Sequence, residues 1–302
     1  MVVVRERMDR TVEGWNYRQA YEWGVARLQE AEVAEAELNA RLLLEYICKT
    51  NRNTLLVHGE REVTAAEQEC YVKYISEREA HKPLQYIVGV QEFMGLEFLV
   101  DENVLIPRQD TEILVEEAMR HLHDGMRILD MCTGSGCILL SLLYYSNGCT
   151  GLGVDVSEQA LTVAGRNTEC IRKLKSDIQV EFLQSDLFGQ LSPDEWEFEM
   201  IVSNPPYIQS GVIDTLMPEV RQFEPRLALD GMEDGLYFYR KIAREAKPYL
   251  AGGGALLFEI GYDQGEAVRE IMAAEGFTGI EIIKDFAGLD RVAFATLSIL
   301  RN

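Results

Sequence analysis

Cysteine, long apolar runs and basic charge are all scarce in this sequence, and each scarcity excludes a class of protein. The six cysteines among 302 residues include no C-x-x-C pair, which argues against a disulfide framework or a structural zinc site and fits reduced thiols in a cytosol. No apolar run approaches the ~20 residues of a membrane span, and the three valines before Arg5 are too few for a signal peptide. We therefore expect a cytoplasmic protein without a membrane partner.

The charge is strongly acidic and unevenly divided. The 29 Lys and Arg against 50 Asp and Glu give a net charge of −21. Residues 1–85 hold 12 basic and 15 acidic side chains, or −3, which leaves 17 against 35, or −18, for residues 86–302. A surface of this sign repels a phosphate backbone, so we expect no direct binding of nucleic acid. The 47% hydrophobic content is typical of a folded globular protein.

Two regions precede the main part of the chain. From residue 17 to residue 75 apolar residues recur at helical spacing, and the run 30–40 is rich in the helix formers Glu and Ala. This pattern predicts a small all-α domain over residues 1–85. Residues 93–100 alternate apolar and polar side chains around a glycine, which predicts a β-hairpin linker within residues 86–103.

Residues 104–302 alternate apolar strands with amphipathic helices. Such alternation predicts an α/β domain, a mostly parallel sheet with helices on both faces. Two further apolar runs near the C-terminus would complete the sheet, with an antiparallel final strand. The expected strands cover residues 127–130, 152–155, 179–183, 200–203, 255–260, 280–283 and 292–299.

A glycine-bearing turn follows the first of these strands. Gly134 and Gly136 let the backbone pass close to a ligand, and Asp155 ends the next strand, where a carboxylate can accept hydrogen bonds from two ribose hydroxyls. The dinucleotide fingerprint G-x-G-x-x-G is not matched, which disfavours a pyrophosphate cofactor. Without Asp155, a plain strand-to-helix connection would explain the turn as well.

The segment from Asp130 to Gly136 resembles the first motif of the class I S-adenosylmethionine (SAM) methyltransferases, with Cys132 where a glycine is usual. The segment 184–188 resembles the family's adenine-recognising segment, although Asp186 could instead cap the following turn. The resemblance implies SAM as cofactor. The residues it assigns to the cofactor are Cys132, Thr133, Gly134, Ser135, Gly136, Asp155, Asp186, Leu187 and Asn204.

The most specific segment is Asn204-Pro-Pro-Tyr207, at the carboxyl end of an apolar strand. Pro205 and Pro206 stiffen the loop and lack N–H groups. The Asn204 side-chain oxygen and the Pro205 carbonyl can each accept one N–H of a planar NH₂ group, with Tyr207 against its flat face. Such alignment suits direct methyl transfer without a metal or a general base. The motif occurs in methyltransferases of adenine, guanine and glutamine, so it identifies the acceptor group and leaves the substrate open.

Further segments resemble the HemK/PrmC family over essentially the whole chain. That family methylates the glutamine side-chain amide in the Gly-Gly-Gln (GGQ) loop of peptide chain release factors. The resemblance implies that Asn204, Pro205, Pro206 and Tyr207 bind the glutamine, that Asn204, Pro205 and Tyr207 are catalytic, and that Pro107 and Arg108 wall the site. The segments are 82–89, 104–112, 223–229, 258–261 and 284–291.

Some alternatives stay open at this stage. A nucleic-acid amino methyltransferase could use the same Asn-Pro-Pro-Tyr geometry, and a binding protein could keep the fold without catalysis. Arg108 could instead be an exposed ion-pair residue. We interpret His121 and His123 as solvated side chains, so no metal site is expected, and Glu259 as a structural acceptor for backbone N–H groups. We further hypothesise that residues 1–85 dock the substrate protein.

Overall fold

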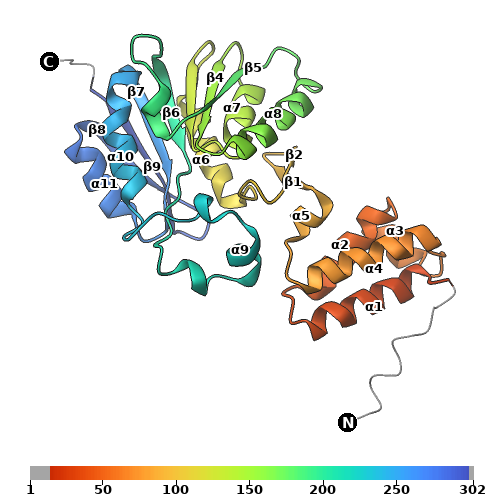
Figure 1. Ribbon diagram of the computed structural model, residues 1–302. Helices are drawn as coiled ribbons and strands as arrows, with labels where there is room; N and C mark the ends of the chain where they lie inside the picture. Colours follow the sequence, from red (N-terminus) through yellow and green to blue (C-terminus); the bar gives the residue numbers. More distant parts are fainter. Residues whose placement is uncertain (1–13, 299–302) are drawn as a thin grey trace. The chain divides into compact units, whose positions relative to one another are not determined.

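The computed structural model describes residues 14–298, and the chain divides into two compact units between Val88 and Gly89 (Figure 1). The valines before Arg5, the start of the expected helical domain and the end of the last expected strand lie outside the described residues.

The first unit is helical. Its core contains the fully buried Leu28, Leu43, Leu44, Tyr71 and Ile75. Capping boxes at Asn16 and Thr64 begin two of its helices, because each side chain accepts an N–H of the first turn and a Gln or Glu three residues on returns the bond. The helices are α1 (Tyr17–Glu30), α2 (Ala36–Ile47), α3 (Arg52–Val57), α4 (Ala65–Glu79) and α5 (Leu84–Val88).

The Glu- and Ala-rich run 30–40 is not one continuous helix, although its helix formers favour one. The chain turns between α1 and α2, where Glu32 and Glu35 adopt positive φ values of 55° and 52°. Val33 is buried in the core of the unit at this turn. Burial of this side chain therefore outweighs the local helix propensity.

The predicted β-hairpin begins the second unit. Strands β1 (Val90–Phe93) and β2 (Leu96–Leu99) pair antiparallel around Met94 and Gly95, whose φ values of 52° and 69° suit a two-residue turn. Phe93, Leu96 and Phe98 are buried in one core with apolar side chains of the helices at residues 109–121 and 137–145. The hairpin is therefore part of the second unit's core.

A seven-stranded mixed sheet forms the centre of the second unit, in the order β5-β4-β3-β6-β7-β9-β8. Strands β3 to β7 are parallel, and β9 runs antiparallel between β7 and β8. The strands are β3 (Arg127–Met131), β4 (Thr150–Asp155), β5 (Gln179–Gln184), β6 (Phe198–Ser203), β7 (Leu250–Glu259), β8 (Phe277–Lys284) and β9 (Asp290–Leu297). The predicted α/β fold with an antiparallel final strand is confirmed.

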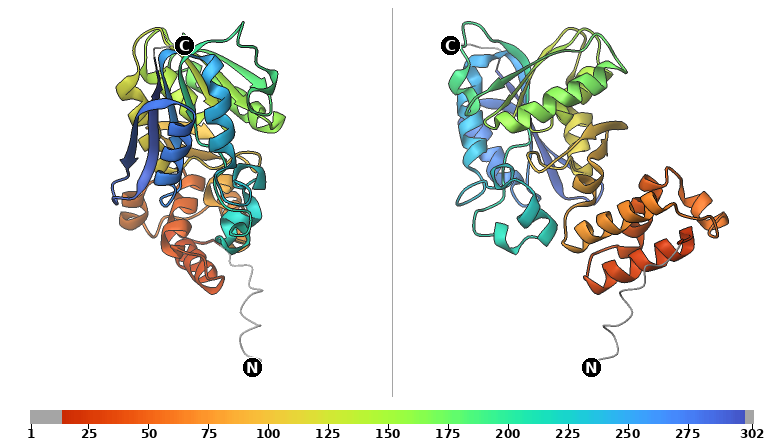
Figure 2. Two further views of the ribbon diagram at one scale, coloured as in Figure 1. Left: turned by 90° about the vertical axis from the view of Figure 1, so that its left-hand side faces the viewer. Right: turned by 45° about the vertical axis from the view of Figure 1, so that its right-hand side comes forward.

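Helices cover both faces of this sheet (Figures 1 and 2). Alternate residues of a strand point to opposite faces, so Ile128 joins the core beneath α6 (Gln109–His121), α7 (Cys137–Tyr145) and α8 (Glu158–Arg172). Leu129 joins the core beneath α10 (Tyr237–Ala246) and α11 (Gly265–Ala274). The short helix α9 (Pro218–Phe223) lies in the long connection after β6.

Among residues 14–298, none of the helices combines the length and the apolarity that crossing a bilayer requires.

Candidate active site

The turn after β3 is built on backbone conformations that favour glycine. Gly134 and Gly136 have φ values of 55° and 78°, and Cys132 adopts 64° despite its side chain. Asp130 is fully buried at the end of β3 and accepts a 2.6 Å hydrogen bond from the Thr133 hydroxyl. Burial raises the pKa of Asp130 to about 7, although the hydrogen bond from Thr133 lowers it. The buried Asp130 carboxyl group therefore anchors the turn through Thr133.

Asp155 ends β4 beside this turn. One carboxylate oxygen accepts the Gly134 N–H at 2.9 Å and the other accepts the Ser157 N–H at 2.9 Å. Burial raises the pKa of Asp155, while these backbone N–H groups lower it. Each oxygen keeps lone-pair capacity for a further donor. The two backbone N–H groups therefore orient the Asp155 carboxylate, which can still accept hydrogen bonds from hydroxyl groups.

Asp186 and Leu187 follow β5. Asp186 precedes a 3₁₀ turn but makes no side-chain capping bond to it, so the capping alternative is wrong. Its carboxylate lies 3.3 Å from the Lys241 ammonium, and most of this side chain is exposed. Leu187 is buried with a φ of 51°. An acid and an apolar side chain thus stand side by side at the strand end.

The Asn204-Pro-Pro-Tyr207 loop leaves the end of β6. The Asn204 side-chain nitrogen donates to the Thr111 hydroxyl at 3.2 Å. The Tyr207 phenol donates to the Glu259 carboxylate at 3.1 Å, and the Tyr207 carbonyl accepts from the Gln264 side chain at 3.0 Å. The loop is therefore held by side chains from α6, β7 and the segment before α11.

Glu259 has a different partner from the one we expected. Its carboxylate accepts the Tyr207 phenol, and no backbone N–H donates to it within residues 14–298. Burial raises the pKa of Glu259, while hydrogen bonding from Thr111 and Tyr207 and the charge of Arg291 lower it. Arg291 in turn pairs with Asp110 at 3.1 Å. Residues distant in the sequence thus meet behind Asn204.

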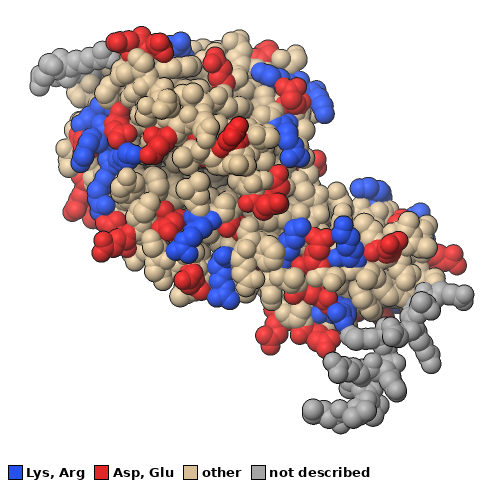
Figure 3. Space-filling view, viewed as in Figure 1, with Lys and Arg blue, Asp and Glu red and all other residues tan. Residues whose placement is uncertain are grey.

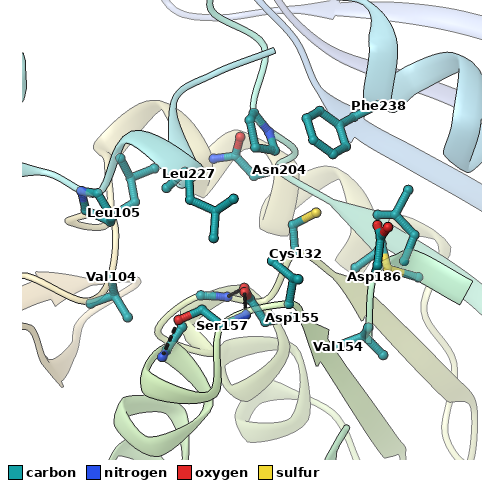
Figure 4. Close-up of a pocket in the computed structure, with 18 of the residues that line it drawn as sticks. Val104, Leu105, Cys132, Val154, Asp155, Ser157, Asp186, Asn204, Leu227 and Phe238 are labelled. Carbon is teal, nitrogen blue, oxygen red and sulfur yellow. Dashed lines mark hydrogen bonds between the residues drawn. The ribbon is translucent and has the colours of Figure 1, made fainter. Parts of the chain in front are cut away.

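A pocket opens at the carboxyl ends of the parallel strands, with about 740 Å³ of space between its walls, part of it open to solvent. Figure 4 shows Asn204 on one wall, Asp155 and Ser157 opposite, and Cys132 between them. Of the predicted site residues, those that line the pocket are Cys132, Gly134, Asp155, Asp186, Leu187, Asn204 and Pro206.

Within residues 14–298, the other predicted site residues do not line this pocket. Thr133, Ser135 and Gly136 shape the turn from behind, and Pro205 and Tyr207 belong to the loop that carries Asn204. Pro107 and Arg108 do not line the pocket either. The Arg108 guanidinium instead forms an ion pair with Glu224, whose side chain is 1% exposed. Arg108 is therefore anchored to a buried partner, unlike an exposed surface pair.

Sequence reasoning missed several lining residues. Phe238 enters from α10, and Leu227 comes from the connection after α9. Ser157 lines the wall beside Asp155, and Val104 comes from the chain before α6. Val104 and Leu227 lie in segments that carried the family resemblance, so those segments were the available signal. Phe238 lies outside these segments, and no sequence signal pointed to it.

His123 is exposed as expected, and His121 is partly solvated, with its side chain 37% exposed. Its ring stacks on Phe294 with centroids 4.0 Å apart, and Nε2 lies 3.0 Å from the Glu117 carboxylate. Across residues 14–298, no three His, Cys, Asp or Glu side chains gather in a way that could hold a metal ion. His121 thus serves packing against β9.

Comparisons with known proteins agree with this geometry. Residues 19–89 match the family model described as PrmC N-terminal domain, and residues 108–222 match the model described as Methyltransferase small domain. A methyltransferase structure from Pyrococcus furiosus, 17% identical, covers 78% of this chain and all of its own with a TM-score of 0.51. This likeness concerns the fold alone. The sheet, the turn and the strand-end acids define a class I SAM-dependent methyltransferase.

Curated relatives narrow this class. Release factor glutamine methyltransferase of Geobacter sulfurreducens is 38% identical over 278 residues, which are 92% of this chain and 95% of the relative. The protein of the same description from Moorella thermoacetica is 41% identical over 281 residues, 92% and 97% of the two chains. The chain belongs to the family of release factor glutamine methyltransferases. The resemblance to the HemK/PrmC family is confirmed.

Proposed function

We propose that this protein transfers the methyl group of SAM to the side-chain amide nitrogen of the glutamine in the GGQ loop of release factors. The single observation that carries the proposal is the placement of Asn204. Its amide nitrogen is occupied by Thr111, which leaves its oxygen to accept a substrate N–H at the pocket wall.

The pocket suits SAM chemically. Asp155 offers lone pairs for ribose hydroxyls, and Asp186 beside Leu187 can receive the amine edge and one face of an adenine. When bound, the cofactor supplies a methyl group on a cationic sulfur. Phe238 and Leu227 add apolar wall on the Asn204 side, which keeps water away from the reacting groups.

The chain's residues contribute alignment to the reaction. Asn204 Oδ1 and the Pro205 carbonyl would each accept one hydrogen of the substrate amide, which points the nitrogen lone pair at the methyl carbon. Bound SAM would supply the methyl carbon to this nitrogen and keep the electron pair of the broken carbon–sulfur bond on its sulfur, and the methylated amide would lose one proton. The acceptors stabilise the positive charge that develops on the nitrogen.

The charge favours a protein substrate over a nucleic acid. Residues 86–302 carry −18, and basic side chains lie scattered among acidic ones on the face in Figure 3. A nucleic-acid methyltransferase would need a basic approach to its pocket. All six cysteines are free thiols, which supports our assignment of the protein to the cytoplasm.

The first test measures transfer of a labelled methyl group to a purified unmethylated release factor. Its Gln→Ala loop variant, duplex DNA and ribosomal RNA serve as parallel acceptors. We expect label in the intact factor alone. Label in nucleic acid, or in the Gln→Ala variant, would refute the proposed substrate.

Asn204→Ala tests the proposed role of this side chain. We expect turnover to fall about a hundredfold or more, the scale of losing one preorganised hydrogen-bonding group, while SAM affinity stays within a few-fold by calorimetry. Turnover equal to that of the unaltered protein would refute the role.

We assign docking of the substrate protein to residues 1–85, because this less acidic part carries −3 against −18 for residues 86–302. Deleting residues 1–88 should raise the KM for an intact release factor far more than the KM for a short glutamine peptide. Unchanged SAM affinity would show that the remaining unit is folded. Equal effects on both substrates would contradict docking.

A further inference from the structure

The Gln264 side chain, immediately before α11, uses its whole amide group in hydrogen bonds. Its oxygen accepts the Gly261 N–H at 2.9 Å and the Tyr239 phenol at 3.2 Å. Its nitrogen donates to the Tyr207 carbonyl at 3.0 Å and to the Gly235 carbonyl at 3.3 Å. This single side chain therefore joins the loop after β6 to the end of β7, to α10 and to the segment before α10.

The orientation of the Gln264 amide follows from its backbone partners. A backbone N–H can only donate a hydrogen bond, and a carbonyl oxygen can only accept one. The Gly261 N–H must therefore meet the Gln264 oxygen, and the two carbonyls must meet the nitrogen. A reversed amide would place donor against donor at Gly261 and acceptor against acceptor at Tyr207. The orientation therefore depends on no titratable group.

Two glycines let the neighbouring segment approach the Tyr207 backbone closely. A Cβ at Gly231 would lie 2.7 Å from the Tyr207 carbonyl carbon, and a Cβ at Gly235 would collide with the Tyr207 carbonyl oxygen. The Gly231 N–H also donates to the Ile208 carbonyl at 2.7 Å. The chain around Tyr207 is thus packed against the segment 231–235, and the Gln264 nitrogen bonds to both.

We propose that Gln264 is a positioning residue that holds the Tyr207 carbonyl and thereby fixes the Pro205 carbonyl, the second acceptor for the substrate amide. The inference deepens the proposed function and rests on it. At the other end of the loop, the Ser203 hydroxyl donates to a β3 carbonyl at 2.6 Å. Between these two anchors, Pro205 and Pro206 have fixed φ angles, so few backbone torsions stay free. Holding Tyr207 therefore determines where the Pro205 carbonyl points.

Gln264→Glu is the direct test, because glutamate has the same length and keeps an oxygen for the Gly261 N–H. It loses the NH₂ group, and its ionised carboxylate would repel the Tyr207 and Gly235 carbonyl oxygens. At saturating release factor and SAM, we expect kcat to fall at least ~10-fold, since a misplacement of about 1 Å can cost a hundredfold in rate. SAM affinity measured by calorimetry should stay unchanged.

Tyr239→Phe is the matched control. It removes the phenol that meets the Gln264 oxygen, and it leaves both bonds from the Gln264 nitrogen in place. Tyr239 is fully buried, so the variant should lose stability in urea unfolding while its kcat stays close to that of the unaltered protein. Gln264→Met removes all four bonds at a similar length and should lower kcat as the Glu variant does. It keeps the proposal testable where Gln264→Glu does not fold.

The outcomes separate the two proposals. If the unaltered protein methylates no release factor, the proposed function fails, and the same kcat comparison is made on whichever acceptor takes the label. The positioning role is overturned by a folded Gln264→Glu or Gln264→Met variant with full kcat. It is also overturned by a Tyr239→Phe variant that is equally slow, or by loss of SAM binding in step with kcat.

Discussion

Replacing Asp130 by Asn should change how the stability of the second unit depends on pH. Asp130 is fully buried, and its pKa is raised from 3.8 to about 7. The raised value means that the folded state binds the proton more tightly than the unfolded state. The stability that the protonated group contributes is present below about pH 4 and is lost as the pH rises through about 7.

The size of this effect follows from the shift. Roughly three pKa units at ~1.4 kcal/mol each amount to about 4 kcal/mol. The free energy of unfolding should therefore fall by about this much between pH 4 and pH 8.5 because of Asp130. An asparagine cannot ionise, so the variant should gain about 4 kcal/mol relative to the unaltered protein over the same range.

Urea unfolding can measure this difference within the second unit. Trp196 lies there, and replacing Trp15 and Trp23 by Phe leaves it as the only tryptophan. Asp194, whose side chain is exposed, offers a control: Asp194→Asn should run parallel to the unaltered protein across the pH range. A difference between Asp130→Asn and the unaltered protein that is constant with pH, or that shrinks as pH rises, would refute the reasoning.

Two further changes test the cofactor side of the pocket, and a third tests how the β-hairpin is held to the second unit. Asp155→Ala removes the acceptor of two backbone N–H groups and should weaken SAM binding at least ~10-fold; calorimetry showing unchanged affinity would contradict its role. Cys132→Gly removes a Cβ at a φ of 64° and should be about 1 kcal/mol more stable than Cys132→Ala in urea unfolding; equal stability would argue against strain. Asn167→Ala breaks bonds to both backbone groups of Leu99 and to the Ser135 carbonyl and should cost at least ~3 kcal/mol; a loss below 1 kcal/mol would show that water replaces them.

The apolar runs of the sequence were sufficient to predict every strand of the large sheet, because its strands are short apolar segments between helices and turns. The ends were less accurate. Strand β7 begins at Leu250, five residues before the predicted start, because Gly252 to Gly254 have low strand propensity and interrupt the apolar pattern. The break between α1 and α2 was also missed, because only tertiary burial of Val33 reveals it.

The site was predictable where neighbours in the sequence act together. The turn at Gly134 and the strand-end Asp155 do meet around one pocket, as expected from the βαβ arrangement. The partners of Asn204 and Tyr207 could not be predicted, because Thr111 and Glu259 are 93 and 52 residues away from them. Polar contacts between residues so far apart in the sequence produce no local sequence pattern from which they could be predicted.

The position of β9 has a consequence for how the protein is made. This strand comes last in chain order, yet it lies between β7 and β8, and its Val292, Ala293 and Ala295 are fully buried. As a chain emerges from the ribosome N-terminus first, β7 must wait with an unpaired edge until Asp290 and the residues after it appear. Such an edge invites pairing with other chains. A chain stopped before Asp290 would carry the whole pocket lining and still lack the strand that closes its sheet.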